Sequence, residues 1–352
     1  MATEPSSPPL RMVDIARKAG VSRMAVSAVL MGTGQGRVRV STETAERIRT
    51  IAAEHGFRPN PAAQQLAGRS SGIIAVVANN WQNYLTQRAL AWLHEAAVHA
   101  GTRVMAQFCQ DDIAPIRSLL RDVRAGWIDG VVYLAYENEQ QWPEIAELFR
   151  SVPTALVAIG DLDDPDVSSV ISDVSTGAGA SIAHLHDQGR SRPVFVSEET
   201  ESAAFAQRRD AYRAAARERG IPFDDSRIVI ETKGWRLLDP SFYARFDELA
   251  RRLVDGLQAD SILCDTDFTA SGLIRAFRRI GVRVPEDVSV IGWGDLQFAG
   301  LFDPPLTTVS LELPTLLTRA VERLKRAREK QPQEHIDRVD TRLVIRESSS
   351  LS

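Results

Sequence analysis

The sequence predicts a small all-α head with a helix-turn-helix motif, followed by an α/β core of doubly wound parallel sheets in two lobes. Two short helix patterns meet at a glycine between residues 13 and 30, and strand and helix patterns alternate from residue 72 onward. Residues 1–72 hold 10 Lys or Arg against 5 Asp or Glu, whereas the remaining residues hold 32 against 41. A basic N-terminal part on an acidic body is typical of a DNA-binding head joined to a separate domain.

The stretch from Val13 to Leu30 predicts two helices joined by a tight turn. Gly20 is expected to end the first helix because glycine accepts the left-handed conformation, and Ser22 is expected to cap the second. Apolar residues mark one face of each helix: Val13, Ile15, Ala16 and Ala19, then Val26, Val29 and Leu30. The other face of the second helix carries Ser22, Arg23, Met24, Ser27 and Ala28. A short helix with a small, partly polar face fits the major groove of DNA.

A third helix is expected to complete the head. Ser41 or Thr42 caps it, and Gly56 ends it. The prolines of residues 57–61 then break the chain, and a very short helix follows over residues 62–67, with Asn60 as its cap. Leu66 is its single large apolar residue, so this helix should be unfolded alone and should fold only against a partner.

Strand-like apolar runs alternate with helical patterns through the rest of the chain. The expected strands are 73–78, 104–108, 131–134, 155–159, 194–197, 262–264 and 288–291. The expected helices are about 84–100, 112–125, 139–150, 174–188, 202–219, 241–256 and 267–280. Buried strands with intervening helices indicate parallel sheets with a ligand crevice between two lobes. The alternation alone does not distinguish two lobes from one large sheet.

The ends of the chain and its cysteines indicate a cytoplasmic protein. No apolar run approaches the roughly 18 residues of a membrane span. The first ten residues are rich in Pro and Ser and are expected to form a disordered tail, not a signal peptide. Cys109 and Cys264 are expected to be buried free thiols in a reducing compartment.

Five motifs give the chain its resemblance to a known family. They are Asp14-Ile-Ala with Ala19-Gly-Val-Ser and Ala25-Val-Ser27, Phe57-Arg-Pro-Asn60, Ala63-Gln-Gln-Leu-Ala-Gly68, the stretch from Val284 to Gly292, and Pro304-Pro-Leu-Thr-Thr308. With these motifs the chain resembles the lactose/galactose repressor family of bacterial transcription regulators. The resemblance implies a head over 11–58, a hinge helix over 59–71 and a periplasmic-binding-protein-like core over 72–347, between tails 1–10 and 348–352. It also implies three crossings between the lobes. We expect lobe 1 at about 72–170 and 296–320, and lobe 2 at about 171–295 and 321–347.

The resemblance implies that the second helix enters the major groove, where Arg23, Met24 and Ala28 match base-contacting positions. Arg23 can grip guanine through two hydrogen bonds, or it can contact phosphate instead. Ser22 and Ser27 are expected to cap the helix or bond phosphates.

The hinge and a long loop are the other expected DNA contacts. Hinge helices of two subunits would sit in the minor groove with Asn60 and Ala63, and Leu66 would wedge a base step open, unless it packs on the core. The loop 31–40 is about four residues longer than the family's usual version. Its Arg37 and Arg39 would lie on the DNA backbone, or the loop is merely solvated.

The resemblance also implies effector residues in the crevice. Arg208, or its neighbour Arg209, matches an effector-contacting arginine, and Asp267 and Asp295 match acidic positions. Residues that could line the crevice are Asn79, Asn80, Trp81 and Trp235. Thr266 stands where the family has asparagine, and Gly294 where it has aspartate, which puts an ordinary sugar effector in doubt.

Two other functions are compatible with parts of the sequence. Asp265-Thr-Asp-Phe-Thr269 fits an aspartyl-phosphate phosphatase pattern, although this motif normally opens its domain. A sugar-binding protein without DNA function fits the core but not the head. We therefore expect a homodimeric repressor that binds double-stranded operator DNA and a possible sugar or other metabolite, with no enzymatic activity, cofactor, metal or membrane partner.

Overall fold

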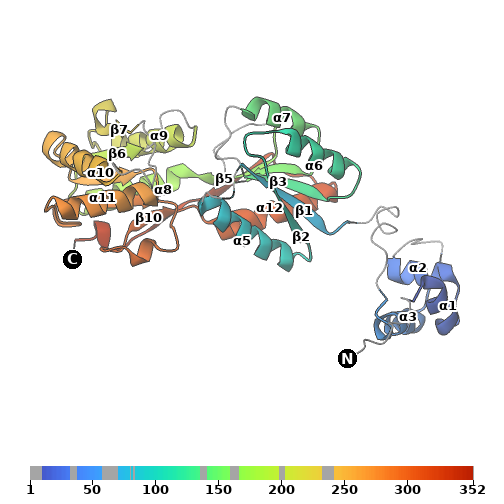
Figure 1. Ribbon diagram of the computed structural model, residues 1–352. Helices are drawn as coiled ribbons and strands as arrows, with labels where there is room; N and C mark the ends of the chain where they lie inside the picture. The colour runs from blue at the N-terminus through green and yellow to red at the C-terminus, as the bar shows by residue number, and fades with distance from the viewer. Residues whose placement is uncertain are drawn as a thin grey trace. The chain divides into compact units, whose positions relative to one another are not determined.

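The computed structural model describes residues 10–31, 38–57, 70–79, 81, 84–134, 141–158, 166–197, 203–231 and 242–351. The chain divides into a unit of residues 1–73 with 122–129 and a unit of residues 74–121 with 130–352. The head, in the first unit, and the core are therefore described separately (Figure 1).

The described residues of the head form three helices: α1 (Met12–Ala19), α2 (Arg23–Met31) and α3 (Thr42–Glu54). Gly20 ends α1 with φ of +65°, and the Ser22 hydroxyl accepts a hydrogen bond from the Ala25 amide at 3.1 Å, so both predictions at this turn are confirmed. Ser41, one of the two expected caps, is the N-cap of α3.

The head has a small apolar core in which Ile15, Val26 and Ile48 are fully buried. Val13 was expected on the inner face of α1 but is 41% exposed. It precedes Ile15 by two positions, which is about 200° around a helix, so it lies on the opposite side. Met31 is buried as well, and the apolar pattern of α2 did not include it.

The segment that leaves the hinge is held by one carboxylate. The Ser71 and Gly72 amides each donate to Asp129 at 2.9 Å, and the Ser70 hydroxyl also donates to it. This arrangement fixes the chain immediately before the first strand of the core.

The core contains two six-stranded sheets, which settles the choice between two lobes and one large sheet. The first sheet has the order β11-β5-β4-β3-β1-β2, and the second β12-β10-β9-β8-β6-β7. The first-sheet strands are β1 (Ile73–Ala78), β2 (Arg103–Phe108), β3 (Gly130–Leu134), β4 (Ala155–Ala158), β5 (Ser169–Asp173) and β11 (Ile336–Asp340). The second-sheet strands are β6 (Pro193–Ser197), β7 (Ile228–Ile230), β8 (Ser261–Cys264), β9 (Ser289–Trp293), β10 (Thr307–Ser310) and β12 (Arg342–Val344). Neighbouring strands pair in parallel at β1–β3, β3–β4, β4–β5, β5–β11, β6–β7, β6–β8, β8–β9 and β9–β10, whereas β10 and β12 are antiparallel.

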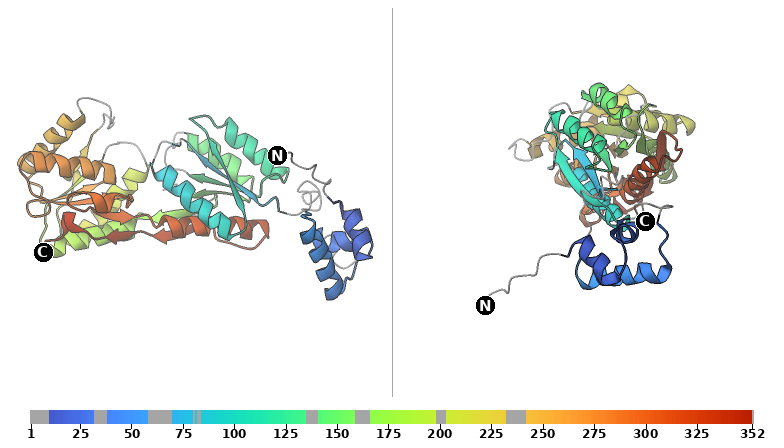
Figure 2. Two further views of the ribbon diagram at one scale, coloured as in Figure 1. Left: turned by 60° about the horizontal axis from the view of Figure 1, so that its bottom comes forward. Right: turned by 90° about the vertical axis from the view of Figure 1, so that its right-hand side faces the viewer.

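Helices surround both sheets (Figures 1 and 2). Those of the first lobe are α5 (Tyr84–His99), α6 (Ala114–Arg124), α7 (Trp142–Arg150) and α12 (Leu313–Arg328). Those of the second lobe are α8 (Val174–Asp187), α9 (Ala203–Glu218), α10 (Phe242–Arg251) with a π-helical end (Arg252–Gly256), and α11 (Asp267–Arg279). In the part of the chain that the structure describes, no helix is long and apolar enough to span a membrane.

Within the described residues the chain passes between the two sheets three times, but not at the expected boundaries at 296, 320 and 321. Residues 296–310 stay in the second lobe because β10 pairs with β9. Helix α12 and strand β11 belong to the first lobe, where α12 buries its apolar face against α5 and β3 to β5, and β11 pairs with β5. The crossings lie at residues 173–174, 310–313 and 340–342.

Gly177 of helix α8 lies against strand β10 and the crossing at residues 340–342. A Cβ atom at this position would lie 2.4 Å from Val309 Cγ1 and 2.6 Å from Thr341 Oγ1. Gly179, in the same helix, has no atom within 4 Å of such a Cβ.

These two glycines give a matched prediction. Gly177→Ala should destabilise the core by about 1–3 kcal/mol through overpacking, since its buried neighbours must move. Gly179→Ala should stabilise it by about 0.5–1 kcal/mol because alanine favours a helix interior. Urea unfolding followed by circular dichroism measures both changes, and equal effects of the two variants would contradict the close approach.

Candidate functional site

The exposed face of α2 is the candidate DNA interface. Arg23 and Met24 lie at the start of the helix, and Met24 is 64% exposed. Within the described residues Arg23 has no hydrogen bond or ion pair, so its guanidinium is available to a partner. Ser22 is exposed, whereas Ser27 and Ala28 are half-buried.

The remaining expected DNA contacts are mostly not described. Arg39 is exposed. Arg37, Asn60, Ala63 and Leu66 lie outside the described residues, so their roles stay predictions.

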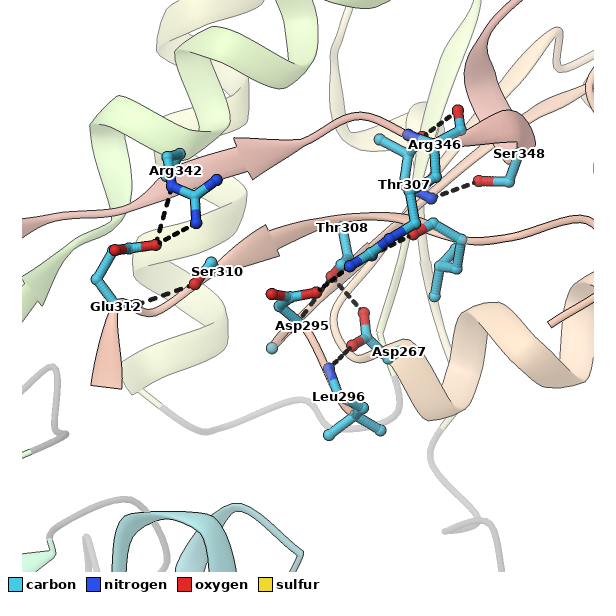
Figure 3. Close-up of polar contacts among 12 residues, drawn as sticks. Asp267, Asp295, Leu296, Thr307, Thr308, Ser310, Glu312, Arg342, Arg346 and Ser348 are labelled. Atoms are coloured by element: carbon cyan, nitrogen blue, oxygen red, sulfur yellow. Dashed lines mark hydrogen bonds and ion pairs between the residues drawn. The ribbon is translucent and has the colours of Figure 1, made fainter. Parts of the chain in front are cut away.

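The carboxyl edge of the second sheet holds the expected acidic residues of the effector site. Asp267 begins α11 and is fully buried. Its carboxylate accepts the Leu296 amide at 2.6 Å and the Thr308 hydroxyl, as Figure 3 shows. Burial raises the pKa of Asp267 to about 6, because desolvation penalises its charged form. This carboxylate therefore links the start of α11 to the turn after β9 and to β10.

Asp295 lies in that turn with a positive φ of 46°. Its amide donates to Thr308 Oγ1 at 3.2 Å, and its carboxylate pairs with Arg346 at 2.8 Å (Figure 3). Both expected aspartates thus hold the turn in place through contacts with the protein itself.

Arg208 is the arginine that reaches this edge. Its Nη1 donates to the Asp265 carbonyl at 2.8 Å, and its guanidinium lies 5.0 Å from the centre of the Trp293 ring. The Nε–H is buried without a partner in the described residues. Arg209 instead pairs with Asp210 at 2.9 Å, which favours Arg208 over its neighbour as the effector contact.

Position 266 has a structural role in this chain. Thr266 is the N-cap of α11, and its hydroxyl accepts the Thr269 amide at 3.1 Å. The residue that replaces the family's asparagine therefore satisfies a helix terminus.

The aromatic and amide candidates are only partly placed. Trp81 is 56% exposed, and Asn80 and Trp235 lie outside the described residues. Asn79 is bonded to Asp111, accepting its amide at 2.8 Å and donating to its carboxylate at 2.9 Å. A cavity of about 470 Å³ lies elsewhere, at the amino ends of β4 and β11, and its lining includes none of the expected effector residues.

The phosphatase pattern does not form a nucleophilic site. Asp265 and Asp267 are both fully buried. The Asp265 carboxylate accepts the hydroxyls of Ser197 at 3.0 Å and Thr269 at 2.8 Å, so it has no access to a phosphate ester. The described residues contain no cluster of three His, Cys, Asp or Glu that could hold a metal ion. Cys109 and Cys264 are free and buried, as expected.

The sequence did not identify three residues of this edge, Trp293, Thr308 and Arg346, or Arg88, which contacts the edge from the first lobe. Thr308 stands inside a quoted family motif and Trp293 directly follows another, which is a usable signal. Arg88 lies on a helix of the other lobe and binds backbone oxygens, so no side-chain pattern pointed to it.

The raised pKa of Asp267 predicts a pH-dependent stability. Between its ordinary value of 3.8 and about 6, the unfolded chain ionises this group while the folded chain keeps it protonated, so stability falls as pH rises through that range. Asp267→Asn cannot ionise and should gain on the wild type by about 3 kcal/mol between pH 4 and pH 7. Urea titrations at several pH values measure this, with exposed Asp255→Asn as control, and a pH-independent difference would contradict it.

Comparison with known proteins identifies both parts of the chain. Residues 11–60 match the family described as bacterial regulatory proteins, lacI family, and residues 182–349 match the periplasmic binding protein-like domain. The HTH-type transcriptional regulator DegA of Bacillus subtilis is 28% identical over 349 residues, covering 96% of this chain and 97% of DegA. The lactose operon repressor of Escherichia coli is 24% identical over 317 residues, covering 90% and 84%.

Solved structures show the same fold. The lac repressor dimer bound to operator and the anti-inducer ONPF has a TM-score of 0.75 at 24% identity, covering 97% of this chain and 99% of that one. The complex of the transcriptional regulator CelR with cellobiose has a TM-score of 0.64 at 22% identity, covering 97% and 100%. The head thus matches the lacI family of bacterial regulatory proteins, the core matches the periplasmic binding protein-like domain, and the whole chain has the fold of the lac repressor.

Proposed function

We propose that this chain is a sequence-specific transcriptional repressor that binds a pseudo-palindromic operator as a homodimer in the bacterial cytoplasm. The exposed start of α2 is the observation that carries the proposal: Met24 is exposed there, and Arg23 has no partner among the described residues. Such a helix start is the part of a helix-turn-helix motif that contacts base edges. The relative solved with its operator is a dimer, which supports two heads on one DNA site.

Direct reading of the operator depends chiefly on Arg23. Its guanidinium donates two parallel hydrogen bonds to guanine O6 and N7, whereas Met24 and Ala28 offer only apolar contact to a thymine methyl group. Arg37 and Arg39 add contacts to the DNA backbone. Asn60, Ala63 and Leu66 of the hinge act in the minor groove, where Leu66 opens a base step.

A small molecule bound between the lobes regulates this binding. The ligand would contact four of the expected residues: Arg208, Trp81, Trp235 and Asn80. Asp267 and Asp295 would act by holding the turn beside it. The cellobiose complex of CelR supports a sugar or another metabolite as the ligand class. Thr266 and Gly294 remove two groups that would bind sugar hydroxyls, so the effector relies on other contacts. The ligand shifts the equilibrium between two arrangements of the lobes, and operator affinity changes with it. No catalytic step is part of this function.

Selection of bound DNA from a random pool tests the proposal. The full chain should enrich one pseudo-palindromic sequence whose half-sites lie about one helical turn apart. The selection is repeated with metabolite mixtures, and loss or gain of the enriched sequence identifies an effector. Retention of no sequence above the input pool at low salt would overturn the proposal.

Arg23 gives the sharpest mutational test of the interface. Arg23→Ala should weaken operator binding by about 1–3 kcal/mol, roughly 5- to 150-fold, and should relax preference at one base position. Random DNA should lose much less, and Arg23→Lys should keep random binding while losing the bidentate contact. Fluorescence anisotropy on operator and scrambled duplexes measures both losses. Equal loss on the two duplexes would assign Arg23 to a phosphate instead.

A further inference from the structure

Helix α5 of the first lobe contacts the turn after β9 of the second lobe. Arg88 Nη1 donates to the carbonyl oxygens of Gly294, at 3.1 Å, and Asp295. Four residues earlier on the same helix, the Tyr84 ring meets the Phe298 ring edge-on, with centroids 5.2 Å apart. Residues separated by four positions share one helix face, so these contacts form a single patch between the lobes.

The turn is built to present those two carbonyl oxygens. Its amides are used inside the second lobe: Gly294 donates to the Val309 carbonyl at 2.8 Å, and Asp295 and Leu296 donate to Thr308 and Asp267. The backbone has φ of +124° at Gly294 and +46° at Asp295. With three successive amides held by the lobe, the carbonyls of residues 294 and 295 are the groups left to meet Arg88.

Gly294 is required by conformation and not by space. A Cβ atom there would lie 3.8 Å from Asp267 Oδ2, an ordinary contact, but a φ of +124° is strained for any residue with a side chain. An aspartate at position 294 of this chain would be strained in this turn. The loss of that aspartate and the presence of the Arg88 contact are therefore consistent with each other.

Arg88 has no competing ionic partner. Within the described residues no carboxylate lies within ion-pair distance of its half-buried guanidinium, and its hydrogen bonds go to these two carbonyls. The carboxylate of Asp295, which lies in the turn itself, is paired with Arg346.

We propose that Arg88 is a positioning residue that holds the two lobes together by binding the 294–295 carbonyls in the absence of an effector. An effector that binds between the lobes must then either leave this contact intact or compete with it. The competition with an effector rests on the proposed regulatory function, whereas the Arg88 contact does not.

Distance measurement between spin labels tests the contact directly. Labels at exposed Glu95→Cys on α5 and Glu218→Cys on α9 report the separation of the lobes, in the full chain diluted with unlabelled protein. The two native cysteines are buried, and burial raises the pKa of Cys109 to about 11, so neither competes for the label. The unliganded wild type should give one narrow distance distribution.

The variants separate a specific contact from general damage. Arg88→Ala should broaden the distribution toward longer distances, Arg88→Lys should restore it in part, and exposed Arg121→Ala should leave it unchanged. Gly294→Ala should act like Arg88→Ala, because it disturbs the turn without touching the arginine. An Arg88→Ala distribution that matches the wild type would overturn the proposal.

Operator binding by the same proteins tests the coupling separately. If Arg88→Ala separates the lobes and changes affinity for the selected operator by at least severalfold, both the contact and its regulatory role are supported. If the lobes separate with operator affinity unchanged, the contact stands and the coupling in the proposed function fails.

Discussion

The buried carboxylate of Asp267 is the constraint on which the candidate effector site depends. It lies at the start of α11, accepts the Leu296 amide and the Thr308 hydroxyl, and thereby joins three separate segments of the second lobe. It also requires a glycine at position 292, since a Cβ atom there would lie 2.3 Å from Asp267 Oδ1. A buried carboxyl group is tolerated only when its oxygens are hydrogen-bonded. The same hydrogen bonds fix the conformation of the turn after β9. That conformation determines which carbonyl oxygens of the second lobe face Arg88 of the first lobe.

This constraint explains why the two departures from the family pattern have different effects. Thr266 keeps a polar side chain but uses it to cap α11, so that side chain is committed to the protein. Gly294 has no side chain, and its positive φ belongs to a turn in which the carbonyl oxygens of residues 294 and 295 face Arg88. Neither position has a free side-chain group for a ligand in the described residues, and the Gly294 carbonyl accepts a hydrogen bond from Arg88 of the other lobe.

The sequence predicted the parts of the fold whose residues follow a simple pattern. The strands β1, β3, β6 and β8 are continuous apolar runs, as strands buried on both faces must be. Strands β5 and β10 were missed because they carry Ser, Thr and Asp, whose polar groups are buried through bonds to distant residues; Ser172, for example, donates to the Leu311 carbonyl. Without β10 and β11 the second and third crossings could not be placed. Arg88 was out of reach because its acceptors are backbone atoms about 200 positions away.

The three crossings and the Arg88 contact restrain the lobes in different ways. At the crossings the Thr341 hydroxyl donates to the Asp173 carbonyl at 2.6 Å and accepts the Gly177 amide at 2.9 Å. The Ser172 hydroxyl donates to the carbonyl of Leu311 in the crossing at 310–313. Hydrogen bonds therefore join all three crossing segments. These groups are buried, so breaking the bonds would leave unsatisfied polar atoms at a high energetic cost. The half-buried Arg88 is cheaper to release, because water can replace its carbonyl partners. Rotation of one lobe against the other should therefore keep the hydrogen bonds between the crossing segments and break those of Arg88. The contact between α5 and the 294–295 turn is thus the place where ligand binding can change the arrangement of the lobes.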